Sequence, residues 1–121
     1  MRIICVDDEA LVLQLTASLC RKLPQVDEVE AFDSAQAALD WIKENDADIA
    51  LLEIDMPNMD GIEMIKQIRQ TEGYKFTPII ALTTENQDSK MQEGKAAGAT
   101  GWIVKPFTSE KLLALVKKII G

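Results

Sequence analysis

The sequence predicts an α/β fold in which a parallel sheet of five strands is covered by helices on both faces. Three observations predict it. Short continuous runs of Ile, Val and Leu alternate with longer stretches in which apolar residues recur every three or four positions, as expected of buried strands and amphipathic helices. Five such pairs follow one another with no linker, repeat or low-complexity segment between them. The length of 121 residues, 47% of them hydrophobic, suits one domain with one core.

The strands are predicted from the apolar runs. Residues 2–6 and 48–54 are nearly all apolar, as expected of central strands covered on both faces. The run 26–32 alternates apolar with acidic residues, which is typical of an edge strand. The fourth strand is expected at 78–83, with a proline at its first position, and the fifth at 101–104.

The helices are predicted from the stretches between these runs. The first begins near residue 9, and leucines that recur every four residues, Leu11, Leu15 and Leu19, are expected to face inward. Ser34 occupies an N-cap position before the second helix, and Gly61 opens the third. The inward stripes of the second, third and last helices are expected to comprise Ala38, Leu39, Ile42, Ile62, Ile65, Ile68, Leu112, Leu113, Val116, Ile119 and Ile120.

The fourth predicted helix, residues 86–97, has a thin apolar face. Its apolar residues are mainly Met91, Ala96 and Ala97. Such a face buries little area, so we expect this helix to shift more easily than the others. The last helix follows, with Thr108 or Ser109 as its N-cap.

The composition excludes several classes of chemistry. The chain carries 20 acidic and 13 basic residues, a net charge of −7, and no histidine. Without imidazole there is no Ser-His-Asp or Cys-His nucleophile, no histidine-ligated metal and no phosphohistidine carrier. No run is basic enough to neutralise a phosphate backbone, so direct binding of nucleic acid is not expected. Proton or phosphoryl chemistry must therefore use carboxylates and lysine.

The cysteines and the apolar runs bear on the location of the protein. Cys5 and Cys20 form neither a CxxC pair nor a zinc cluster, and we expect buried thiols in a reducing compartment, with a redox role as the alternative. No charged leader precedes an apolar segment at the N-terminus, and no apolar run approaches the roughly 18 residues that span a bilayer. We therefore expect a cytoplasmic protein without membrane insertion.

Polar side chains follow four of the predicted strands. They are Asp7 and Asp8 after the first, Glu53 after the third, Thr83 and Thr84 after the fourth, and Lys105 after the fifth. Parallel strands direct their carboxyl ends to one edge of the sheet, so these groups are expected to gather there. The carboxylates repel one another, and a hard divalent cation such as Mg²⁺ would relieve the repulsion. Lys105 adds a positive charge to the same edge.

Four motifs resemble a known family. They are Val6-Asp7-Asp8-Glu9, the segment 53–61 with the sequence Glu-Ile-Asp-Met-Pro-Asn-Met-Asp-Gly, Thr83, and Lys105-Pro106-Phe107. In order and spacing they resemble the receiver domains of bacterial two-component response regulators, and the resemblance runs from Arg2 through the last helix. It implies a flavodoxin-like fold with strand order 2-1-3-4-5, as in chemotaxis receivers, and a single receiver domain over residues 1–121.

The resemblance implies a phosphoacceptor site that depends on Mg²⁺. In the family, an aspartate at the end of the third strand accepts a phosphoryl group from a histidine kinase or a phosphotransfer protein, and Glu53 stands at that position here. Asp8 would bind the metal directly, Asp7 directly or through water, and the backbone carbonyl of Asp55 would complete the protein ligands beside Glu53. Phosphoryl transfer depends mainly on positioning and charge neutralisation. The implied protein is a signalling domain and not an enzyme acting on other substrates.

The same resemblance assigns the other site residues. Thr83 would bond one phosphoryl oxygen and Lys105 another, and a cis peptide before Pro106 would direct the lysine inward. Asp55 and Glu85, two residues after the acceptor and the threonine, would modulate loss of the phosphoryl group. Both are also compatible with ordinary solvated loop acids.

Glu53 departs from the family pattern, in which the acceptor is aspartate. Its extra methylene displaces the attacking oxygen, and a misplacement of about 1 Å can lower a rate ~10²-fold. Three interpretations remain open: an introduced Asp→Glu change that blocks or imitates phosphorylation, a receiver that works without phosphorylation, and a glutamate that is itself phosphorylated. The longer side chain is expected to reach toward Lys105 and Thr83, where a phosphoryl group would otherwise lie.

The signal is expected to leave through the face formed by the fourth helix, the fifth strand and the fifth helix. Trp102 on that strand would change rotamer as Thr83 moves inward, and a Trp102 fixed within a constant partner surface is the alternative. Trp41 is expected only to pack. Four lysines on this face either steer an acidic partner or only aid solubility: Lys95, Lys111, Lys117 and Lys118. Three methionines near the acceptor either face the kinase or pack in the core: Met56, Met59 and Met64.

Two rival functions share parts of this pattern. The chain is alternatively the receiver half of a longer DNA-binding regulator. A Mg²⁺-dependent phosphatase of the haloacid dehalogenase type also places carboxylates, Thr and Lys at strand ends. That class needs a DxDx(T/V) motif on its first strand, where this sequence has Asp7-Asp8-Glu9-Ala10.

Overall fold

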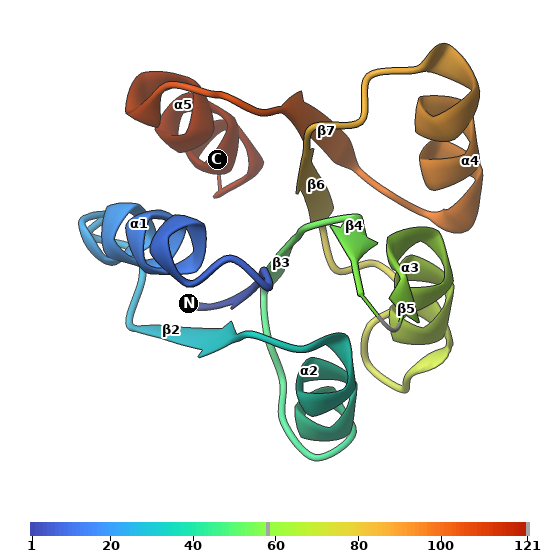
Figure 1. Ribbon diagram of the computed structural model, residues 1–121. Coiled ribbons are helices and arrows are strands. Elements are labelled where there is room, and N and C mark those ends of the chain that lie inside the picture. The colour runs from blue at the N-terminus through green and yellow to red at the C-terminus, as the bar shows by residue number, and fades with distance from the viewer. Residues whose placement is uncertain (58, 121) are drawn as a thin grey trace.

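The computed structural model describes residues 1–57 and 59–120, in which five parallel strands form one sheet with helices on both faces (Figure 1). The elements are β1 (Arg2–Val6), α1 (Ala10–Arg21), β2 (Glu28–Phe32), α2 (Ala35–Ile42), β3 (Ile49–Leu52), β4 (Asp55–Met56), β5 (Met59–Asp60), α3 (Gly61–Gln70), β6 (Ile79–Thr83), α4 (Asp88–Ala97), β7 (Gly101–Val104) and α5 (Ser109–Ile120). Asn58, within the predicted acceptor motif, and Gly121 lie outside the described residues.

The strand order of the sheet is β2-β1-β3-β6-β7, and all its pairs are parallel. The predicted order 2-1-3-4-5 is therefore confirmed, because β4 and β5 are not part of this sheet. These two elements form a two-stranded antiparallel hairpin in the loop between β3 and α3. The sequence pattern predicts only a loop there.

Helices α1 and α5 lie on one face of the sheet, and α2, α3 and α4 lie on the other (Figure 1). Successive strand residues point to opposite faces, so each strand contributes to two hydrophobic clusters. On β1, Ile3 and Cys5 pack with residues of α1 and α5, whereas Ile4 and Val6 pack with residues of α2 and α3. This two-sided cover explains why the central strands are apolar without interruption.

The edge strand β2 is confirmed, although it begins at Glu28 rather than at residue 26. Of its apolar residues Val29 is buried and Ala31 is exposed. Trp41 from α2 packs against Phe32 with ring centroids 5.8 Å apart, and the Arg2 guanidinium lies 5.4 Å from the Trp41 ring. The packing role predicted for Trp41 is therefore confirmed.

The predicted inward leucine stripe of α1 is wrong. Leu11 is 81% exposed and Leu15 53% exposed, and only Leu19 of the three is buried. Each four-residue step advances about 40° around a helix of 3.6 residues per turn, so a strict four-residue repeat drifts off one face. The sheet instead contacts the face made by Leu13, Thr16, Ala17, Leu19 and Cys20.

Side-chain caps fix the starts of two helices where the sequence predicts them. Ser34 Oγ accepts the Ala37 N–H at 3.1 Å before α2, and Thr108 Oγ1 accepts the Lys111 N–H at 3.1 Å before α5. Such a cap stabilises a helix by about 1 kcal/mol. Helix α4 has no side-chain cap at Gln87, and Gly94 is its one buried residue, so the prediction of a thinly packed helix is confirmed.

Gly61 holds the acceptor loop against the start of α3. Its N–H donates to the Ile54 carbonyl at 3.0 Å, and a Cβ at this position would overlap the Ile54 backbone. We expect Gly61→Ala to lower the free energy of unfolding by about 3 kcal/mol, because backbone cannot move aside as a side-chain end can.

Equilibrium urea unfolding measures this effect, and Gly101→Ala is the matched control. A Cβ at Gly101 would approach only side-chain atoms, at 3.5 Å or more. Equal losses in the two variants would contradict the prediction.

Within the described residues no helix is long and apolar enough to cross a bilayer.

Candidate functional site

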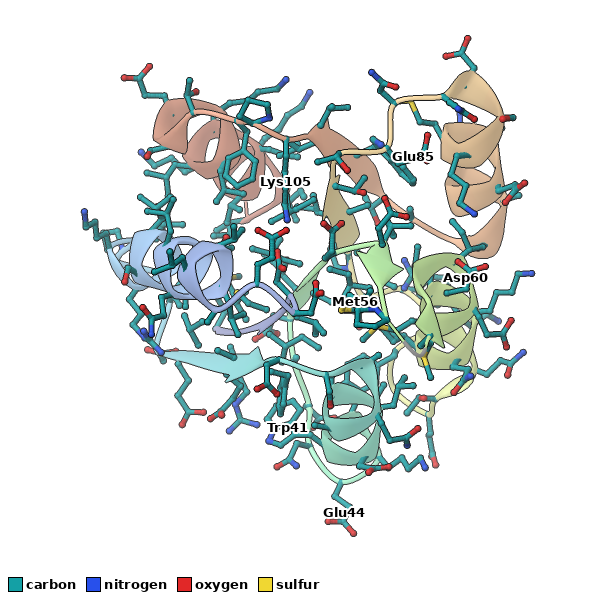
Figure 2. All side chains as sticks on the ribbon, in the orientation of Figure 1. Trp41, Glu44, Met56, Asp60, Glu85 and Lys105 are labelled. Atoms are coloured by element: carbon teal, nitrogen blue, oxygen red, sulfur yellow. The ribbon has the colours of Figure 1, made fainter. Side chains whose placement is uncertain are left out.

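The carboxyl ends of four adjacent strands bring the predicted site residues together. Asp7 follows β1, Glu53 follows β3, Thr83 ends β6 and Lys105 follows β7. Figure 2 shows Lys105 reaching from the end of β7 toward the loops after β1 and β3. Its backbone N–H donates to the Thr83 carbonyl at 2.7 Å, which continues the pairing of the two strands to the site.

Lys105 bridges two buried carboxylates. Its Nζ lies 2.8 Å from Asp7 Oδ2 and 3.0 Å from Glu53 Oε1, and the three side chains are only 10%, 7% and 5% exposed, respectively. Two buried carboxylates this close destabilise the fold unless a cation lies between them. The protein supplies that cation as the Lys105 ammonium.

The remaining carboxylate oxygens bind backbone N–H groups. Asp7 Oδ1 accepts the Glu9 N–H at 2.9 Å at the approach to α1. Glu53 Oε2 accepts the Ile54 N–H at 2.7 Å and lies 3.4 Å from the Asp55 nitrogen. The Glu53 carboxylate is therefore turned back over its own backbone, with both oxygens engaged.

Thr83 is completely buried, and its hydroxyl points to the loop acids rather than to Glu53. Its Oγ1 lies 3.5 Å from Asp55 Oδ2, a long hydrogen bond, and accepts the Glu85 N–H at 3.2 Å. The predicted reach of Glu53 toward Lys105 is thus observed. The hydroxyl of Thr83 instead pairs with Asp55.

Comparison with known proteins identifies the family. Residues 3–117 match the family described as response regulator receiver domain. The chain belongs to that receiver family. It is a receiver of the CheY type and a signal transducer of two-component systems. Receivers are signalling proteins, so the phosphatase interpretation is not supported.

The receiver is similar to chemotaxis proteins over almost its whole length. CheY-3 of Vibrio cholerae serotype O1 is 35% identical over 119 residues, which cover 98% of this chain and 91% of that protein. The structure of the chemotaxis response regulator CheY4 of Vibrio cholerae has a TM-score of 0.90 and 38% identity, and covers 98% of this chain and 97% of that one. The transcriptional regulatory protein ResD of Bacillus subtilis is 38% identical over 98% of this chain but only 48% of its own length.

The acids of the receiver do not form a ready-made metal cage. Within residues 1–57 and 59–120, no three His, Cys, Asp or Glu side chains gather closely enough to hold an ion. Asp7 is buried and paired with Lys105, whereas Asp8 is exposed. Mg²⁺ needs only one or two carboxylate ligands because it keeps several waters. The carboxylate oxygens of Asp7 and Asp8 are therefore suitable ligands for it.

The Lys105–Pro106 peptide bond is cis, as the resemblance implied. Of the two roles predicted for the methionines, packing is confirmed for Met64, which is completely buried, and Met56 and Met59 are half-buried against the same core. Met64 therefore cannot contribute to a kinase-facing patch.

The two cysteines are free and buried, as predicted. A hydrogen bond between them raises the pKa of Cys5 and lowers the pKa of Cys20. Their side chains thus meet inside the cluster between the sheet and α1, and neither faces the site.

Two residues that fix the position of α4 and its neighbours were not predicted from the sequence. Arg69 donates to the carbonyls of Gly98, Tyr74 and Thr77 and so ties α3 to the end of α4. Gly94 lies directly against the Trp102 ring. The only sequence signals were a basic residue beside an apolar stripe and a glycine in the middle of a predicted helix.

Alkaline pH is expected to destabilise the receiver through Lys105. Burial lowers the pKa of the ammonium, but the hydrogen bonds and charges of Asp7 and Glu53 outweigh burial, so the pKa of Lys105 is raised. Its stabilisation is therefore fully present below the pKa of an unfolded lysine, about 10.4, and is lost as the pH rises through the higher folded value.

Melting temperatures measured from about pH 9 to about pH 12 test this expectation. Burial raises the pKa of Tyr74 to about 12. In this pH range the tyrosine therefore ionises more readily in the unfolded chain than in the folded one, which also lowers stability. Tyr74→Phe removes that contribution, and Lys105→Met in the same background removes the lysine. An equally steep alkaline fall with and without Lys105 would contradict the assignment.

Proposed function

We propose that this receiver relays a signal from a histidine kinase or phosphotransfer protein to a downstream protein, and that Glu53 occupies its phosphoacceptor position in an unreactive, charge-paired form. The observation that supports this most is the contact of Lys105 Nζ with both Asp7 and Glu53. The carboxylate of Glu53 holds the ammonium that a phosphoryl group would otherwise engage. Glu53 thus places a negative charge at the acceptor position, but its carboxylate is not positioned to attack a phosphoryl donor.

The chain supplies the positioning groups for phosphoryl transfer. With aspartate at position 53, Lys105 pairs with one phosphoryl oxygen and Thr83 donates its hydroxyl to another. Such transfer needs alignment and neutralised charge more than covalent chemistry. Because Thr83 is buried and Lys105 is 10% exposed, both interactions take place largely away from solvent.

Asp7, Asp8 and the backbone carbonyl of Asp55 are the proposed holders of Mg²⁺. The ion neutralises charge on the phosphoryl group when it is bound. The Asp55 carboxylate and the backbone N–H of Glu85 flank the Thr83 hydroxyl, and the Glu85 carboxylate accepts the Gln87 N–H. The proposed role of both acids is to order or repel the water that would remove a phosphoryl group.

The proposed output face comprises α4, β7 and α5. Glu85 connects it to the site, because its N–H donates to Thr83 Oγ1 and its carbonyl accepts the Trp102 Nε1–H at 2.9 Å. Movement of Thr83 thus reaches Trp102 through one residue. The basic patch on this face is exposed and suits an acidic partner: Lys95, Lys111, Lys117 and Lys118.

We assign the receiver to the cytoplasm, where both thiols stay reduced.

Phosphoryl uptake by the Glu53→Asp variant tests the proposed function. A variant that stays unreactive would favour the second candidate, a receiver that binds its partner without phosphorylation.

A further inference from the structure

Gly94 lies in the middle of α4, where a glycine is unfavourable. Glycine in a helix interior costs about 1 kcal/mol relative to alanine, and α4 already has no side-chain N-cap. Yet Gly94 is the one residue of this helix that is buried. The absence of a side chain at position 94 therefore serves a purpose that offsets the unfavourable helix propensity of glycine.

The indole of Trp102 occupies the space that a side chain at position 94 would need. A Cβ built on Gly94 overlaps Cζ3 of Trp102 and lies 3.1 Å from its Cε3. At the other end of the ring, Nε1 donates to the Glu85 carbonyl at 2.9 Å. The ring is thus held between the backbone of α4 and the loop that follows β6.

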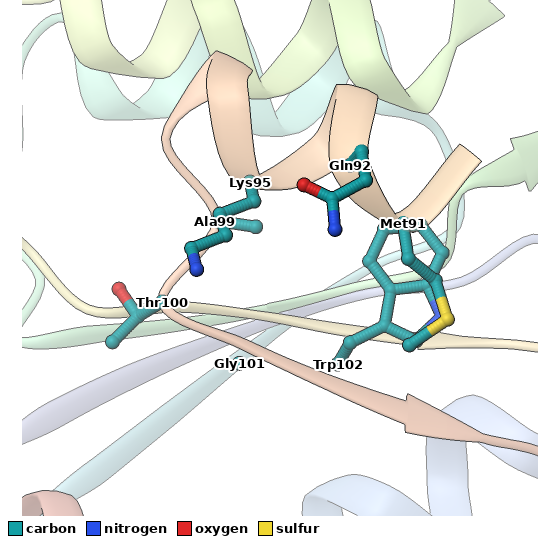
Figure 3. A pocket seen from close by; sticks show the side chains of 7 residues that line it. All are labelled: Met91, Gln92, Lys95, Ala99, Thr100, Gly101 and Trp102. Atoms are coloured by element: carbon teal, nitrogen blue, oxygen red, sulfur yellow. The ribbon is translucent and has the colours of Figure 1, made fainter. Parts of the chain in front are cut away.

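The same ring forms one wall of a hollow of about 300 Å³ between α4 and β7 (Figure 3). Its lining comprises Met91, Gln92, Lys95, Ala99, Thr100, Gly101 and Trp102. Met91 and Trp102 lie at the same end of the hollow in this view, and Lys95 lies toward the other. The position of the indole therefore sets the shape of the exposed face beside α4.

We propose that Gly94 is a positioning residue for Trp102: it provides the seat that keeps the indole beneath α4 and tied to Glu85. A side chain at position 94 displaces either the ring or the thinly packed helix, and both movements break the contact with Glu85. A role of this contact in signalling rests on the proposed output face. The positioning of Trp102 by Gly94 does not depend on the proposed function.

A double-mutant cycle between positions 94 and 102 tests the seat. By helix propensity alone, Gly94→Ala raises the melting temperature by about 2–5 °C. We expect that rise only in the Trp102→Ala background, where no ring opposes the new methyl group. In the presence of Trp102 the same change is expected to lower the melting temperature.

Fluorescence reports the ring directly once Trp41 is replaced by Phe. Gly94→Ala is expected to shift Trp102 emission to longer wavelength and to remove its protection from an aqueous quencher. Gly101→Ala adds the same methyl group to β7 on the opposite face from Trp102, where the nearest atoms outside its chain neighbours belong to Leu115 and Ile80 at 3.5 Å or more. It is expected to leave both signals unchanged.

The seat is overturned if Gly94→Ala raises the melting temperature equally in both backgrounds, or if emission and quenching match those of the parent. An equal effect of Gly101→Ala on emission would also overturn it. The link to signalling has its own readout, the change in Trp102 emission when Mg²⁺ and beryllofluoride are added to Glu53→Asp. Absence of that change in Glu53→Asp counts against the proposed switch and not against the position of the ring beneath Gly94.

Discussion

Replacing Glu53 by aspartate is expected to produce a receiver that takes up one phosphoryl group from acetyl phosphate in the presence of Mg²⁺, whereas the parent stays unmodified. In the parent, Oε1 of Glu53 binds Lys105, and Oε2 binds the Ile54 N–H. The extra methylene misplaces the attacking oxygen, and an error of about 1 Å costs ~10²-fold in rate. Shortening the side chain restores the position while Lys105 and Thr83 remain in place.

Intact mass after side-by-side incubation measures the uptake. Glu53→Asn provides the matched control, because it has the length of aspartate but no nucleophilic carboxylate. Labelling of the parent at a rate close to that of Glu53→Asp would contradict the prediction and support phosphorylation of glutamate itself. If neither chain is labelled, the receiver acts as a phosphorylation-independent binding module.

Lys105→Met is expected to lower the free energy of unfolding by about 3 kcal/mol near neutral pH. The change removes the one cation that lies between Asp7 and Glu53, two carboxylates that are 7% and 5% exposed. Breaking a buried pair leaves charges that are both desolvated and mutually repelling. An exposed pair would cost no more than about 1 kcal/mol.

Urea unfolding with and without Mg²⁺ measures this loss and locates the metal. If the ion binds this acid pair, it should stabilise Lys105→Met more than the parent, since it replaces the missing positive charge. The double variant Lys105→Met/Glu53→Gln is the control, because it removes one of the two charges and should recover part of the loss. A loss below about 1 kcal/mol would show that water screens the site.

Much of the fold follows from the sequence because its signals are local. Ser34 caps α2 through a bond to a residue three positions on, and the uninterrupted apolar runs mark strands that are covered on both faces. The prediction for α1 failed because local periodicity does not say which face of a helix meets the sheet. Leu11 and Leu15 repeat regularly, yet the sheet contacts the face that contains Leu13 and Cys20.

The site shows the same division. Its residue types follow from the sequence, since each group comes directly after an apolar run and parallel strands end at one edge. Which groups touch one another does not, since Lys105 lies 98 positions from Asp7 and 52 from Glu53. From the sequence, Lys105 is expected only to add a positive charge at this edge, whereas in the folded chain its ammonium lies between Asp7 and Glu53.

By itself, the sequence determined the fold class and the set of carboxylate, hydroxyl and ammonium groups at one edge of the sheet, and its resemblance to receivers implied the strand order. Only the tertiary structure decided that the ammonium binds both acids, that Thr83 turns to Asp55, and that Gly94 makes room for an indole. The physical reason is the distance along the chain over which each interaction acts. Propensity, capping and periodicity act within a few residues along the chain, whereas close contacts between distant segments depend on how the packed elements finally settle against one another.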